Sequence, residues 1–267
     1  MKAHRTLLAA TVLFPMFAAA QPAEVPAASP PAAVGYKVET VCEGLVVPWS
    51  IVFDPTLPAS NPRIFITERP GRVRVYEDGA LNPVTAFMVP DMTKLRGEIG
   101  LMGLCLHPDF AKNKYIYLSY GSSEGDIRVM RYTFGPAQRS LMAGQKDPGG
   151  FSDATVIVKG LPAGSNHAGC RIKFGPDGKL YITAGEMFQR SLAQDPSSLG
   201  GKILRVNDDG SIPEDNPFVG GEFKAKGFRP EIWAWGNRNP QGLAWQPGTG
   251  VLFETEHGPS GEAGSGG

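Results

Sequence analysis

Three short segments of this sequence carry groups that could do chemistry together. Residues 166–171 supply the imidazole of His167, residues 236–242 supply the guanidinium of Arg238, and residues 256–259 supply a Gly-Pro turn with backbone carbonyls. An imidazole takes up a proton near neutral pH, and a guanidinium can hold an oxyanion or a carboxylate. A base, a fixed cation and oxygen ligands for a metal ion together suit redox chemistry on a sugar hydroxyl.

Acidic and amide side chains could orient these reacting groups. Glu186 follows a strand pattern, where its carboxylate could orient His167 and favour the protonated imidazole. Asn239 and Gln241 lie beside Arg238 and could fix the geometry of a cofactor or of the loop. The structural alternatives are a histidine bonded to a loop carbonyl, an arginine in an ion pair, a solvated carboxylate and a plain β-turn.

The composition favours a protein built from short strands. Hydrophobic residues make up 42% of the 267 residues, which is enough for a core, and the 34 glycines and 24 prolines favour tight turns over long helices. Lys and Arg together number 26, as do Asp and Glu, so no basic field is available for nucleic acid. The cysteines Cys42, Cys105 and Cys170 permit one disulfide or three free thiols.

Residues 1–20 have the composition of an export signal. A basic start is followed by a mostly apolar run of about a dozen residues, too short to span a bilayer comfortably, and by three alanines that suit cleavage. Residues 21–35 are rich in proline and alanine and predict an unstructured spacer. We therefore expect a periplasmic or secreted protein with no membrane span after cleavage. An uncleaved anchor is the alternative.

The remaining chain, residues 36–267, repeats one pattern four times. Each unit has a strand that ends near a proline, a turn, and a strand of aromatic and β-branched residues. The four units cover residues 50–68, 103–120, 171–186 and 242–256. Further strands are predicted at residues 72–76, 127–134, 154–158 and 202–206. Glu68 ends the second strand of the first unit and could line the same face as the reacting groups.

A repeat of roughly 50 to 70 residues with two to four strands is typical of propeller blades. The fold class expected is therefore all-β, with about four blades present and the fourth ending after its second strand. A β-sandwich with similar hairpins is the alternative. The sequence contains neither a dinucleotide-binding glycine motif nor a phosphate loop, a nucleophile elbow or a zinc-binding histidine pair.

Several ordered motifs resemble those of the soluble quinoprotein glucose/sorbosone dehydrogenase family, which includes aldose sugar dehydrogenases. The motifs that carry the resemblance are His167-Ala168-Gly169-Cys170-Arg171, Phe174 to Tyr181, Gly185-Glu186, Gly201 to Arg205, Asp209 to Pro213 with Asn216-Pro217-Phe218, Arg238 to Gly242, and Glu256 to Pro259. The resemblance runs from about residue 36 to residue 259. It implies a six-bladed β-propeller, pyrroloquinoline quinone (PQQ), calcium, and oxidation of an aldose at the anomeric carbon to a lactone.

The resemblance also implies roles for individual residues. It places the catalytic base at His167 and cofactor contacts at Arg238 and Asn239. It places a calcium ion on the main-chain carbonyls of Gly258 and Pro259. The partners it implies are a small sugar substrate and an external electron acceptor.

Two departures from the family pattern stand out. Cys170 occupies a position where the family usually has a second glycine, so we expect a thiol to add bulk near the cofactor. After Pro259 the family continues with Gly-Gly-Asp-Glu and two further blades that hold the PQQ carboxylates, which this sequence lacks. Two other functions remain open: a calcium-dependent lactone hydrolase on a similar propeller, and a non-catalytic propeller that binds a partner or glycan.

Overall fold

The computed structural model describes residues 35–137 and 139–258, so the predicted export signal and nearly all of the predicted spacer lie outside the described residues. The chain divides into two compact units, Met1–Glu39 and Thr40–Gly267. Residues 35–39 of the first unit form neither helix nor strand. All of the elements described below belong to the second unit.

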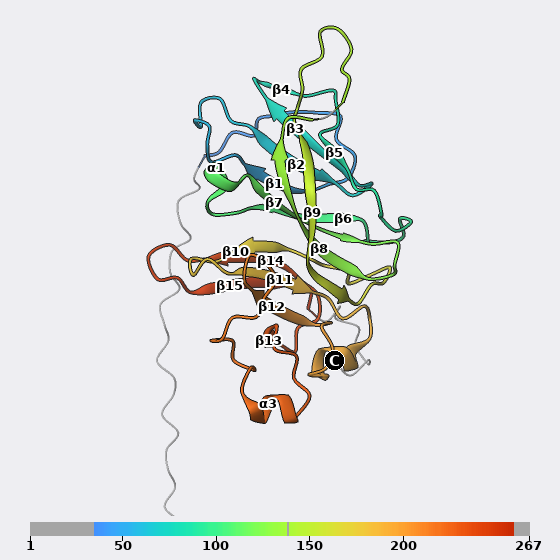
Figure 1. Ribbon diagram of the computed structural model, residues 1–267, viewed down its shortest axis with the longest axis vertical. Helices are drawn as coiled ribbons and strands as arrows, with labels where there is room; N and C mark the ends of the chain where they lie inside the picture. Colours follow the sequence, from blue (N-terminus) through green and yellow to red (C-terminus); the bar gives the residue numbers. More distant parts are fainter. Residues whose placement is uncertain (1–34, 138, 259–267) are drawn as a thin grey trace, which may run out of the picture. The chain divides into compact units, whose positions relative to one another are not determined.

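The second unit consists of antiparallel sheets whose strands are added in chain order (Figure 1). The first sheet contains β1 (Pro48–Phe53), β2 (Ile64–Glu68), β3 (Arg72–Glu77) and the short β4 (Ala80–Leu81) and β5 (Phe87–Met88), which both pair with β3. The second sheet contains β6 (Leu101–Leu106), β7 (Tyr115–Gly121), β8 (Ile127–Gly135) and β9 (Gly150–Leu161). The third contains β10 (Ile172–Phe174), β11 (Leu180–Ala184), β12 (Lys202–Val206) and β13 (Ile232–Trp235). The fourth contains β14 (Pro240–Trp245) and β15 (Leu252–Glu256).

The expectation of an all-β fold built on repeated hairpins is confirmed. The four predicted units form the hairpins β1–β2, β6–β7, β10–β11 and β14–β15, which begin the four sheets. The predicted strand at residues 202–206 coincides with β12. The sequence analysis missed β4, β5 and β13, because strands of two to four residues carry too little periodicity to stand out.

Local sequence explains why these segments pair as hairpins. Apart from Glu68, β2 and β11 are short runs of aliphatic, aromatic and threonine side chains, and every residue of both strands is buried, as expected for strands covered on two faces. The turn between β3 and β4 is Asp78-Gly79, with φ of 52° and 78°. Positive φ at both central residues is the geometry of the tight hairpin turns that Asp-Gly sequences favour.

Apolar side chains pack each sheet against the next one in the chain. One cluster combines Phe65 of β2 with Leu118 of β7 and so joins the first and second sheets. A larger cluster around Ile182 of β11 joins the second and third sheets. A small cluster with Tyr181 and Leu243 joins the third and fourth. Successive sheets stacked through apolar layers in chain order are typical of propeller blades.

The first strands of the sheets meet at the side chain of Arg171, which precedes β10. Its guanidinium lies 4.1 Å from the ring centroid of Trp49 on β1 and donates a hydrogen bond of 3.3 Å to the hydroxyl of Ser50. Its Nε donates to the carbonyl of Gln241 on β14 over 3.0 Å. The hydroxyl of Ser50 in turn donates to the carbonyl of Leu104 on β6 over 3.4 Å. Arg171 therefore links the opening strands of different sheets.

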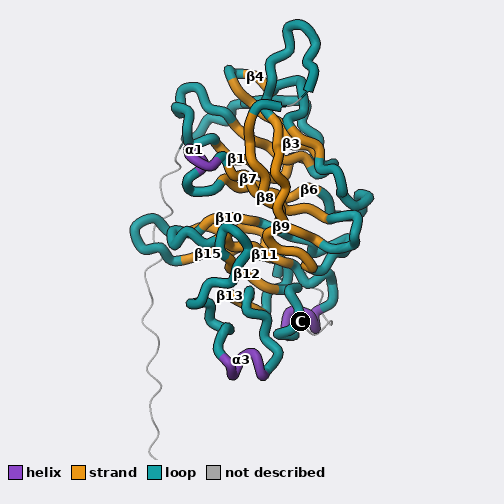
Figure 2. The backbone as a smooth tube through the Cα atoms, in the orientation of Figure 1, coloured by secondary structure: helices purple, strands orange, loops and turns teal. Residues whose placement is uncertain are grey.

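Helices contribute little to the described chain (Figure 2). They are α1 (Phe110–Asn113), α2 (Arg190–Gln194) and α3 (Gly221–Ala225). Within the described residues, none of them has the length or the apolar character needed to cross a membrane. Cys42, Cys105 and Cys170 are all free thiols in the structure.

Candidate active site

The centre of the site is a buried pair formed by His167 and Glu186. His167 lies in the loop between β9 and β10, and Glu186 lies two residues beyond the end of β11. The Nδ1 atom of the imidazole is 2.9 Å and 3.0 Å from the two carboxylate oxygens, and both residues are at most 5% exposed. With Nδ1–H donating to Glu186, the neutral imidazole carries its lone pair on Nε2. That arrangement is the one a general base requires.

Gly185 brings the loop of His167 against the end of β11. A Cβ atom at position 185 would overlap the carbonyl oxygen of His167 and would lie 2.8 Å from Oδ1 of Asn239. Only a glycine permits backbone segments to approach this closely. The backbone therefore holds Glu186 within reach of the imidazole, while the backbone N–H of Glu186 donates to the carbonyl of Arg238 over 2.9 Å.

The same contacts bring the predicted cofactor-binding residues to this place. The backbone N–H of Arg238 donates to Glu256 over 2.8 Å, and its Nη1 donates to the carbonyl of His257 over 2.9 Å. Asn239 is 1% exposed, and its Oδ1 accepts from the N–H of Gly169 over 3.2 Å and from Nε2 of Gln241 over 3.2 Å. These residues therefore connect the loop of His167 with the β14–β15 hairpin.

Two further residues support the site, and the sequence analysis missed both. Glu98 accepts a hydrogen bond of 3.2 Å from the N–H of Ala168, next to the candidate base. Phe188 lies two residues beyond Glu186, and its ring centroid is 3.8 Å from that of His167. Glu98 stands outside the repeated units, and Phe188 is one apolar residue in a loop. Neither has a sequence signal that could have identified it.

Glu68 lies at the end of β2, as predicted, but its carboxylate serves the first sheet. It is fully buried, accepts from Nε of Arg72 over 2.6 Å and from the N–H of Val46 over 2.6 Å, and lies 3.7 Å from Arg74. Among the described residues it has no hydrogen bond or ion pair with His167 or Arg238. The surroundings of Glu68 explain its burial without a ligand.

The predicted calcium position is only partly within the described chain. Gly258 is exposed and follows His257, whose carbonyl is bound by Arg238, whereas Pro259 lies outside the described residues. No group of three or more His, Cys, Asp or Glu side chains is placed to bind a metal ion within the described ranges.

The thiol of Cys170 does not occupy the position expected from the sequence. We expected it to add bulk beside a cofactor, but the residue is fully buried and belongs to the apolar cluster between the second and third sheets. Burial raises the pKa of the Cys170 thiol to about 12, which keeps it protonated and unreactive. Burial also lowers the pKa of the neighbouring Arg171 guanidinium.

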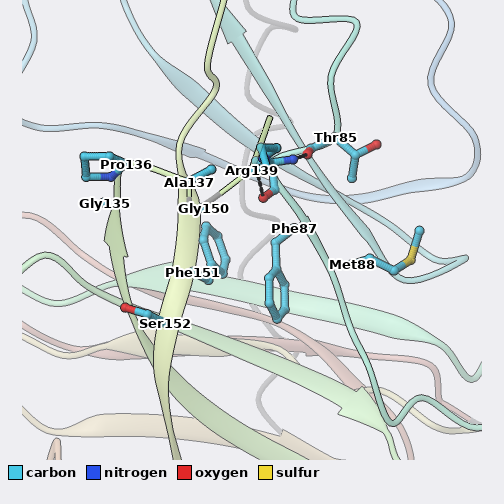
Figure 3. Close-up of a pocket in the computed structure, with 11 residues that line it drawn as sticks. Thr85, Phe87, Met88, Gly135, Pro136, Ala137, Arg139, Gly150, Phe151 and Ser152 are labelled. Carbon is cyan, nitrogen blue, oxygen red and sulfur yellow. Dashed lines mark hydrogen bonds between the residues drawn. The ribbon is translucent and has the colours of Figure 1, made fainter. Parts of the chain in front are cut away.

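A separate pocket of about 500 Å³ lies against outer strands of the first two sheets (Figure 3). Phe87 of β5 and Phe151 of β9 stack there with ring centroids 4.8 Å apart. Arg139 reaches across the pocket and donates to the carbonyls of Thr85 and Ala86. None of the predicted site residues lines this pocket, and its one cation is already bound to carbonyl oxygens.

The fold and the site together define a class of protein. Its members have antiparallel sheets stacked in chain order, and the loops that join the strands carry a buried His–Glu pair beside an arginine. The family model described as Glucose / Sorbosone dehydrogenase matches residues 45–263. This chain therefore belongs to the glucose/sorbosone dehydrogenase family, as its motifs led us to expect.

Named relatives agree with this assignment. The chain is 38% identical over 226 residues to aldose sugar dehydrogenase YliI of Escherichia coli (84% of this chain, 57% of the relative). It is 29% identical over 252 residues to quinoprotein glucose dehydrogenase B of Acinetobacter calcoaceticus (83% of this chain, 48% of the relative). The PQQ-bound aldose sugar dehydrogenase of Streptomyces coelicolor superposes with a TM-score of 0.70 and 30% identity, covering 83% of this chain and 60% of that one. This chain thus spans about half to three-fifths of the length of these relatives.

Proposed function

We propose that this chain is part of an exported, calcium- and PQQ-dependent dehydrogenase with a six-bladed propeller, which oxidises an aldose at the anomeric carbon to a lactone. Family membership supports a sugar dehydrogenase. The observation that carries the proposal is the buried His167–Glu186 pair, with Nδ1 held by the carboxylate at 2.9 Å and Arg238 on an adjoining loop. An imidazole whose Nδ1 is held by a carboxylate keeps Nε2 as its proton acceptor, and the half-buried Arg238 lies nearby.

The side chains at the site fit the proposed cofactor by their donor chemistry. PQQ is a planar quinone that carries carboxylates, which require cations and N–H donors. Arg238 is half-buried, and Asn239 makes its hydrogen bonds with the described residues through Oδ1, not through the amide Nδ2. Arg238 and Asn239 would therefore hold the cofactor, and the carbonyls of Gly258 and Pro259 would hold calcium.

In this proposal the residues of the chain manage the proton of the substrate. Nε2 of His167 takes the proton of the anomeric hydroxyl, and Glu186 stabilises the resulting imidazolium. The anomeric carbon, which carries this hydroxyl, loses its hydrogen together with the bonding electron pair. The C–OH group thereby becomes the C=O group of a lactone. PQQ, when bound, supplies the quinone that accepts this hydride, and an external acceptor takes the electrons afterwards.

A dye-reduction assay tests the proposal. Purified protein is supplied with calcium chloride and PQQ, and reduction of a redox dye is followed with D-glucose and other aldoses. The assay is run on this chain and on any longer product of its gene, with His167→Ala as the control. Sugar-dependent reduction that needs PQQ and His167 supports the proposal. If neither this chain nor a longer product reduces the dye, the proposal is wrong, whether or not the protein hydrolyses lactones.

A further inference from the structure

Phe188 is an exposed aromatic residue held directly at the candidate base. It is 60% exposed, although its ring centroid lies 3.8 Å from the imidazole centroid of His167 at an interplanar angle of 45°. The guanidinium carbon of Arg238 lies 6.0 Å from the same ring centroid. The ring therefore lies beside both polar groups and still presents apolar surface to solvent.

The backbone fixes this ring at the cost of conformational strain. Seven non-glycine residues of the described chain have positive φ, and three of them are at this site: His167 at 52°, Met187 at 58° and Phe188 at 58°. Bulky residues rarely adopt this conformation, and it persists only where the surroundings impose it. Here the constraint is the carboxylate of Glu186, which accepts the N–H of Phe188 while it binds the imidazole.

One carboxylate thus sets the position of the base and of the ring together. A core role does not explain this arrangement, because Phe188 lies outside the apolar clusters and most of its side chain is exposed. An exposed aromatic face next to hydrogen-bonding groups suits a ligand that has both an apolar face and hydroxyls. A pyranose ring has this character, since its C–H groups gather on one face and its hydroxyls lie around the rim.

We propose that the ring of Phe188 is the platform on which the sugar substrate stacks, so that Phe188 determines substrate affinity while His167 receives the proton. This inference rests on the proposed function and assigns a substrate-binding residue to the same site. The ring acts on binding, and so its loss should raise KM and leave kcat nearly unchanged. An aromatic contact of this kind corresponds to roughly a two- to tenfold change in affinity.

The test compares Phe188→Leu, which keeps apolar bulk, with Phe188→Tyr, which keeps the aromatic face. We expect the KM for D-glucose, or for the aldose oxidised fastest, to rise about tenfold in Phe188→Leu and to stay within about twofold of wild type in Phe188→Tyr. Melting temperatures and PQQ titrations accompany both variants. An unchanged KM in Phe188→Leu overturns the inference, as does a loss confined to PQQ affinity, which would make the ring a cofactor contact.

A binding measurement separates this inference from the proposed function. Methyl β-D-glucopyranoside has no free anomeric hydroxyl, so its affinity can be measured without turnover, by isothermal titration calorimetry on wild type and on both Phe188 variants. We expect its dissociation constant to rise about tenfold in Phe188→Leu. If wild type oxidises no aldose but binds this glycoside through Phe188, the proposed function fails and the platform stands. If wild type oxidises aldoses but the dissociation constant of the glycoside is the same in wild type and Phe188→Leu, the proposed function stands and the platform at Phe188 is wrong.

Discussion

At the residue scale, the structure gives Glu186 a definite relation to His167. The two side chains are buried together, and the carboxylate holds Nδ1, which leaves Nε2 as the nitrogen that would receive the substrate proton in the proposed reaction. The same carboxylate accepts the backbone N–H of Phe188. A single side chain therefore orients the candidate base and also constrains the loop that carries the exposed ring.

Replacing Glu186 by glutamine removes the negative charge of the side chain and keeps its size. The amide has nearly the same size but cannot stabilise an imidazolium, and so we expect kcat to fall about 10²–10⁴-fold, similar to His167→Ala. Steady-state rates for wild type, the two single variants and the double variant measure this. Because the two residues act as a unit, the double variant should be little worse than either single variant. Glu222→Gln, on the exposed α3, serves as a control that should keep full activity.

A different result would change the assignment of the base. Near-normal turnover in His167→Ala would mean that the imidazole is structural. Glu186 would then be the first candidate to receive the substrate proton, because it is the carboxylate in contact with His167.

At the scale of elements, the close approach of the His167 loop to the end of β11 depends on Gly185. A methyl group there would overlap the carbonyl oxygen of His167, and the backbone on both sides is held by hydrogen bonds. The N–H of Gly169 also donates to Oδ1 of Asn239, so the loop before β14 is joined to the His167 loop near the end of β11. The site thus depends on three loops fitting together without space for a side chain.

We therefore expect Gly185→Ala to destabilise the protein by about 3 kcal/mol and to reduce kcat, since the overlap must displace His167. Chemical denaturation and dye-reduction rates measure the two effects. Gly221→Ala is the matched control. No atom within 4 Å would meet its Cβ, and alanine favours the helix in which it lies, so stability should stay the same or rise slightly. If Gly185→Ala is as stable as wild type, the prediction is wrong, because the two loops would then move apart at no cost in stability.

At the scale of the molecule, β1 presents apolar side chains that the described residues do not cover. Ile51 is 61% exposed and Phe53 is 60% exposed, and residues two apart in a strand lie on one face. Phe253 of β15 is 57% exposed as well. Within the described chain, β1 and β15 each pair with a strand on one edge and leave the other edge unpaired. Edge strands with exposed apolar side chains favour association between molecules.

We expect this chain, prepared alone, to associate at concentrations of about 10–100 µM. The double variant Ile51→Lys/Phe53→Lys should remain monomeric, because charged side chains on an exposed strand oppose pairing and stacking. Light scattering coupled to size-exclusion chromatography gives the mass in solution. Met142→Lys, at a loop residue that is 73% exposed, controls for added charge and should associate like wild type. A wild-type protein that stays monomeric throughout this range contradicts the prediction.

The sequence alone determined the all-β class, the four hairpin units and the family. Hairpin strands and turns are specified by neighbouring residues, as the agreement between residues 202–206 and β12 shows. Ordered motifs likewise predicted a site with His167, Glu186, Arg238 and Asn239, and the structure brings these residues onto adjoining loops.

Only the tertiary structure decided where individual side chains are directed. Glu68 is the last residue of β2 and Glu186 lies two residues beyond β11, at similar places in their units, yet one is bound by arginines and the other by His167. Cys170 is directed into the core, and Phe188 lies against the base. These outcomes depend on which loops meet across separate sheets and on backbone angles such as the φ of 58° at Phe188. Long-range packing sets such contacts, and no local pattern in the sequence records them.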